Sequence, residues 1–191
     1  MIILLVQMKS SLFHSLHAGE LSQACFKPLI ETYKKERTAG QDFTGTYAKL
    51  SKGQQALFMF YVHTNHAAKS LSDFYWWSAY FYAKGTEWQG IKWSLRFFGE
   101  DSLHSVLQDL ENLLIETAHP VSLETFSLAK DHLDCHPALL ASVKPVHAKY
   151  RDRIPLAVEQ VERYIYLNPG EFVDLEQENL YEPKPDSSVA Y

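Results

Sequence analysis

Histidines are the side chains of this chain best suited to bind a metal or to transfer protons near neutral pH, and there are nine of them. His63 and His66 are three residues apart, and His132 and His136 are four apart, so each pair shares one face of a helix. Metal sites in helical bundles are built from inward-facing side chains on facing helices. These four histidines are therefore candidate ligands for zinc or iron, and solvent-facing or helix-capping histidines are the alternative.

Motifs that would define an enzyme class are absent. Cys135 precedes His136 directly, but neighbours in sequence point in different directions on a helix, so the pair does not define a nucleophile and its base. The sequence contains no HExxH, Cys-x-x-Cys, GxSxG, P-loop or GxGxxG pattern. It therefore assigns no catalytic or cofactor-binding residue and leaves open whether the protein is an enzyme.

The stretch SDFYWWSAYFY, residues 72–82, places seven aromatic rings in eleven residues. On a helix these rings point nearly all round, which is typical of a central helix covered by its neighbours. Each ring can bury roughly 150–250 Å², so we interpret the stretch as the centre of the core. The alternative is a partly open pocket or contact surface walled by Tyr75, Trp76 and Tyr80.

Apolar residues recur with helical spacing along most of the chain. Ser51 followed by Gln54 predicts a capping box at one helix start. Pro28 lies inside another predicted helix and would kink it. The predicted helices are 20–37, 52–69, 73–83, 87–98, 101–118 and 154–167.

The remaining segments are less regular. Residues 1–17 fit either a helix or an edge strand, and residues 122–136 fit a short helix. Residues 137–153 contain two prolines and are expected to bend twice. The sequence thus predicts an all-α fold, a compact multi-helix domain over residues 1–172 around a central aromatic-rich helix. An acidic, proline-containing tail follows over residues 173–191.

Composition is that of a globular domain, with 46 % apolar and 21 % charged residues and a net charge of −5. Residues 100–136 carry eight acidic and one basic side chain, and residues 137–158 carry four basic and one acidic. Such alternation argues against a dedicated nucleic-acid surface. No apolar run approaches the roughly 18 residues of a membrane span, and the opening MIILLV is a poor signal peptide. We expect a cytoplasmic protein that contacts neither nucleic acid nor membrane, with two cysteines kept reduced.

The runs LSKGQQALFMFYVHTNH, LSDFYWWSAYFY and IKWSLRFFGEDSLHSVL, within about residues 50–115, resemble a bacterial family of small helical domains. The family includes a DNA-mimic protein that occupies a DNA-binding partner with its acidic surface. Its glycine-glycine-phenylalanine element is missing, since residues 71–74 read LSDF. The resemblance implies a partner surface whose carboxylates replace phosphates, with the solvated face of an amphipathic helix as the alternative. Those carboxylates would be Glu100, Asp101, Asp109, Glu111, Glu116 and Glu124.

Two functional hypotheses follow. The first is a helical protein that works by protein–protein contact, through a rim of the aromatic cluster or through the acidic helix 101–118. The second is a small-molecule-binding protein or metal-dependent enzyme with a pocket of aromatic and histidine side chains.

Overall fold

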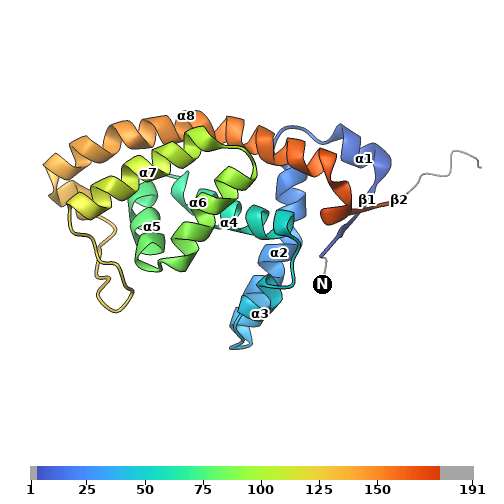
Figure 1. Ribbon diagram of the computed structural model, residues 1–191, viewed down its shortest axis with the longest axis horizontal. Helices are drawn as coiled ribbons and strands as arrows, with labels where there is room; N and C mark the ends of the chain where they lie inside the picture. The colour runs from blue at the N-terminus through green and yellow to red at the C-terminus, as the bar shows by residue number, and fades with distance from the viewer. Residues whose placement is uncertain (1–3, 177–191) are drawn as a thin grey trace, which may run out of the picture.

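The computed structural model describes residues 4–176, which form eight α-helices, two short 3₁₀ helices and a two-stranded sheet (Figure 1). The all-α prediction is confirmed. In chain order the elements are β1 (Val6–Lys9), α1 (Ser10–Ser15), α2 (Glu20–Thr38), α3 (Thr44–Tyr47), α4 (Lys52–Ala67), α5 (Leu71–Ala83), α6 (Thr86–Phe97), α7 (Asp101–Glu116), η1 (His132–Cys135), α8 (Pro137–Leu167), η2 (Pro169–Glu171) and β2 (Val173–Glu176).

Helix α4 lies deepest in the fold and packs against α2, α5, α6 and α8. Eleven of its sixteen residues are buried, against six of thirteen in α5. It begins at the predicted capping box, in which the Ser51 hydroxyl accepts from the Gln54 N–H at 3.1 Å and the Gln54 side chain accepts from the Ser51 N–H at 3.2 Å. The cap satisfies two backbone donors, so α4 can start inside the core.

The aromatic cluster is buried, as predicted. Phe74 on α5 is fully buried and packs on Tyr150 of α8 with ring centroids 4.6 Å apart. Trp88 on α6 is also buried, with its ring 6.1 Å from that of His63. The cluster therefore joins α4, α5, α6 and α8.

Helix α8 crosses almost the whole molecule as one element of 31 residues (Figure 1). The predicted bends within residues 137–153 are wrong, because Pro137 occupies the first helical turn and the helix continues through both Pro145 and Pro155. An internal proline removes one backbone hydrogen bond, and packing of the buried face offsets that loss. The buried residues of α8 are Val143, Val146, His147, Tyr150, Ala157, Val161, Glu162 and Ile165.

Two further predictions of local structure can be compared with the structure. The short helix predicted over residues 122–136 is wrong, since the segment is a loop with one 3₁₀ turn at its end. Pro28 lies inside α2 without ending it. Within residues 4–176, no helix is long and apolar enough to cross a membrane.

The two ends of the described chain are joined in a small parallel sheet, with Val6 opposite Val173 and Lys9 opposite Glu176. Of residues 1–17, which fit either a helix or an edge strand, residues 4–17 contain both strand β1 and helix α1, and residues 1–3 lie outside the described residues. Of the predicted tail, residues 173–176 form β2, and residues 177–191 lie outside the described residues.

Gly53 in the first turn of α4 is a sensitive packing position. A Cβ atom there would lie 2.7 Å from the Phe172 ring and 2.9 Å from the Tyr164 ring. Because two rings cannot both retreat cheaply, Gly53→Ala is expected to lower the free energy of unfolding by about 1–3 kcal/mol in urea titrations. Gly90→Ala in α6 is the matched control, since its Cβ would meet only the flexible Met59 side chain, at 3.3 Å. Equal losses in both variants would contradict this packing.

Candidate functional site

The two histidines of the first pair, His63 and His66, differ in burial and in contacts. His63 is 1 % exposed, and its two ring nitrogens lie 3.0 Å from the Ser78 hydroxyl and 3.3 Å from the Tyr150 hydroxyl. Burial lowers the pKa of His63 to about 3, with the nearby His66 as a second cause. His66 is half-buried and stacks on Trp77 at 3.9 Å. His63 is therefore a neutral core residue whose nitrogens are both in use.

The second pair lies at the base of the loop that follows α7. His132 and His136 stack on each other at 4.0 Å, and His132 also stacks on Tyr75 at 6.1 Å. The Tyr75 hydroxyl is hydrogen-bonded to His119 Nε2. Burial raises the pKa of Tyr75 to about 12 and lowers that of His119, so the phenol donates and the imidazole accepts.

The candidate metal ligands do not gather into one cluster within the described part of the chain. Across residues 4–176, no group of three or more His, Cys, Asp or Glu side chains is placed to hold a metal ion. Among the described residues, His132 and His136 stack on each other, whereas His63 is held by Ser78 and Tyr150 and His66 stacks on Trp77.

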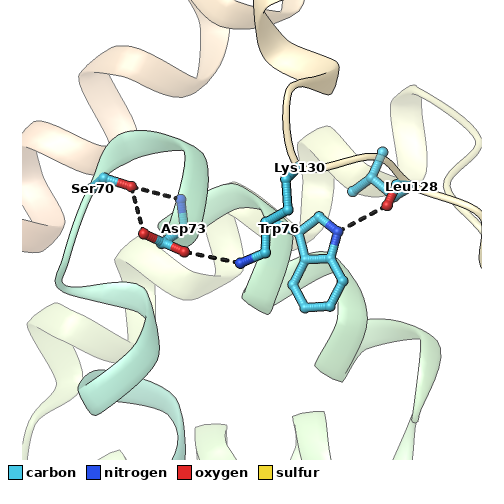
Figure 2. A network of polar contacts seen from close by, with 5 residues as sticks. All are labelled: Ser70, Asp73, Trp76, Leu128 and Lys130. Carbon is cyan, nitrogen blue, oxygen red and sulfur yellow. Dashed lines mark hydrogen bonds and ion pairs between the residues drawn. The ribbon is translucent and has the colours of Figure 1, made fainter.

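The outer face of α5 is covered by the loop between α7 and α8. The Trp76 indole N–H donates to the Leu128 carbonyl at 2.8 Å, and Lys130 pairs with Asp73 at 3.0 Å (Figure 2). The Lys130 ammonium also lies 4.4 Å from the Trp76 ring centroid, within cation–π range. Tyr80 stacks on Trp76 at 5.4 Å. The rings at Tyr75, Trp76 and Tyr80 thus contact protein on their outer side.

The acidic side chains of α7 are partly engaged within the fold. Glu111 is buried and forms an ion pair with Lys92, and Glu100 is also buried. Asp109 pairs with Lys149 at 3.3 Å. Three of the six carboxylates considered for a partner surface are therefore turned inward or paired.

A cationic groove lies between α8 and the turn that joins α4 to α5, and the sequence did not single it out. Its volume is about 710 Å³. The α8 side contributes residues at i, i+3, i+4, i+7, i+10 and i+11, which share one helical face. The lining residues are Ala68, Lys69, Ser70, Leu71, Lys144, His147, Ala148, Arg151, Ile154 and Pro155.

The groove is positively charged although the chain as a whole carries −5. Lys69, Lys144 and Arg151 line it, and no Asp or Glu does. Each of these cations is exposed, and none forms an ion pair with a carboxylate of residues 4–176. Three unpaired cations around one depression make a local field that attracts anions.

His147 forms part of the groove wall and is 9 % exposed. Its Nε2 atom is buried and has no hydrogen-bond partner in the described part of the chain. The ring packs on Phe74 at 5.3 Å, which fixes its position. Burial lowers the pKa of His147, and the charge of Arg151 lowers it further. The groove therefore places the His147 ring, with its Nε2 atom buried, beside three exposed cations.

Comparisons with known proteins find no match to the chain. No protein-family model matches the chain, and searches of curated proteins and of solved structures find no match either. The functional argument therefore depends on the geometry of the groove.

The burial of His63 predicts a measurable pH dependence of stability. Its folded-state pKa of about 3 lies below the ordinary value of 6.5, so between these values the unfolded state binds the extra proton. The contribution to stability is complete above pH 6.5 and declines as the pH falls, by at most about 1.4 kcal/mol per pH unit. When the free energy of unfolding is measured by urea titration at several pH values between 7 and 5, it should change less with pH for His63→Gln than for the wild type. The same pH dependence in both proteins would mean that His63 can be protonated in the folded protein.

Proposed function

We propose that the protein works by protein–protein contact, and that the cationic groove binds an acidic segment of its partner. The single observation that carries this proposal is a groove lined by three exposed cations and by no carboxylate, in which none of the cations is ion-paired within residues 4–176. Charge complementarity of this kind steers a partner and selects against basic alternatives.

The shape of the groove supports a segment of polypeptide as the occupant. Lys144 and Arg151 are seven residues apart on α8, which separates their Cα atoms by about 10 Å along the helix. Lys69 faces them from the α4–α5 turn. Three or four residues of extended chain span about this length, so two carboxylates spaced along one segment can each reach a cation.

Apolar lining adds to this match. Leu71 and Ile154 are half-buried and Pro155 is exposed, so they provide contact area beside the charges. Interfaces combine such apolar contact with charges at the rim. An acidic segment that also carries an apolar side chain is therefore the expected ligand.

The proposal is tested with a fluorescein-labelled peptide of Glu and Leu residues, titrated with the protein in anisotropy measurements at low salt. The double charge reversal Lys144→Glu with Arg151→Glu should weaken binding at least about tenfold, because it replaces two attractions with two repulsions. Binding by the wild type should also weaken as salt is raised, since exposed charges are screened.

The matched control is the double reversal Lys149→Glu with Arg163→Glu, which changes the charge of α8 by the same amount outside the groove. It should leave the affinity within about twofold of the wild type. Absence of binding to the wild type, or equal losses in both double variants, would refute the proposal.

A further inference from the structure

We infer that the groove of one chain binds residues 178–182 of a second copy of the same chain, so that copies associate from tail to groove. This inference deepens the proposed function and depends on it, because it names an acidic segment that the groove takes. The segment reads ENLYE and belongs to the acidic tail over residues 173–191. Its support comes from the chemistry of the segment, from its charge and from the reach of the chain.

The segment has the chemistry expected of the ligand. Glu178 and Glu182 are four residues apart, and Leu180 stands midway between them. Side chains two residues apart point to the same face of an extended chain, so both carboxylates and the leucine can face the groove together. The two Glu Cα atoms would then be about 13 Å apart, close to the spacing of about 10 Å between Lys144 and Arg151 along α8. Each carboxylate can therefore meet one cation.

The charges of the tail and of the groove are complementary. Residues 177–191 carry three acidic side chains, Glu178, Glu182 and Asp186, and one basic side chain, Lys184. The groove is lined by three cations and by no Asp or Glu. Opposite charges steer the tail of one copy towards the groove of another, and like charges oppose contact between two grooves. The expected contact is therefore heterologous, with different surfaces of the two copies meeting.

The reach of the chain assigns the groove to a different copy. Strand β2 ends at Glu176, so Glu178 lies at most about 7 Å further along the chain. Figure 1 shows β2 beside the C-terminal end of α8, running away from the rest of that helix. Arg151 is the groove cation nearest to this end, and it precedes Leu167 at the end of α8 by about 24 Å of helix. Glu178 therefore cannot reach Arg151 within one copy.

The contact area predicts a weak and reversible association. Specific, stable protein interfaces bury at least about 1,200 Å² in total, and five residues of chain in one groove bury less than this. Exposed charges supply much of the attraction, and salt screens them. We therefore expect association at high protein concentration and low salt rather than a permanent dimer.

Sedimentation equilibrium of the full chain tests the inference. The average mass of the wild type should rise with protein concentration at low salt and fall back when salt is added. The tail variant Glu178→Lys with Glu182→Lys, and the groove variant Lys144→Glu with Arg151→Glu, should each weaken self-association at least about tenfold. A wild type that stays monomeric at all concentrations, or association that survives in either variant, would overturn the inference.

A mixture of the two variants separates pairing between copies from pairing within one copy. The tail variant keeps the native groove and the groove variant keeps the native tail, so the mixture should associate although each variant alone does not. A mixture that stays monomeric would contradict pairing between copies. The matched control is Lys149→Glu with Arg163→Glu, which lies outside the groove and should self-associate within about twofold of the wild type. An equal loss in this control would also overturn the inference.

The labelled peptide of Glu and Leu residues distinguishes the failure of this inference from that of the proposed function. If the wild type binds the peptide and stays monomeric, the proposed function stands and the pairing of tail with groove fails. If it neither binds the peptide nor self-associates, both fail. Where self-association is found, excess peptide should dissociate it, because both ligands occupy one groove. Association that persists with the peptide bound would lie elsewhere on the surface and would overturn the inference.

Discussion

Helix α8 crosses the molecule as one 31-residue element although Pro145 and Pro155 each remove a backbone N–H from its interior. Its buried face packs on α2, α4, α5 and α7, and this packing offsets the lost hydrogen bonds. The groove depends on that continuity. Lys144 and Arg151 share a face with His147 because all three belong to one unbroken helix. A turn at Pro145 would send Lys144 in another direction and leave the α4–α5 turn without a facing wall.

The sequence predicted the fold to a useful degree because its strongest signals are local. The pairing of Ser51 with Gln54 marks the start of α4, and the apolar stripe of α7 is regular enough to place the whole helix. The burial of the aromatic cluster followed from rings on all sides of α5. The parallel pairing of β1 with β2 could not be predicted, because it joins residues about 170 positions apart through four-residue strands.

The candidate site was missed for a related reason. The excess of basic residues over 137–158 was visible in the sequence, but the prolines predicted bends that would have scattered them. Tertiary packing overrode that local preference. The histidine pairs do have helical spacing, but their side chains are used for core hydrogen bonds and ring stacking. His63 completes a core hydrogen-bond network, and His132 stacks between Tyr75 and His136. Helical spacing alone does not distinguish a ligand pair from a packed pair.

The continuity of α8 can be tested directly by pulsed electron–electron double resonance, which measures the distance between two spin labels. Spin labels would be attached at Ala138→Cys and Arg163→Cys, both exposed, in a Cys135→Ser background in which the remaining Cys25 is buried. An unbroken helix separates these Cα atoms by about 37 Å at 1.5 Å per residue. The account predicts one narrow distance distribution centred close to this separation. Any curvature at the prolines would shorten the distance slightly. A broad distribution, or one centred below about 25 Å, would show that α8 breaks and that the groove does not form as described.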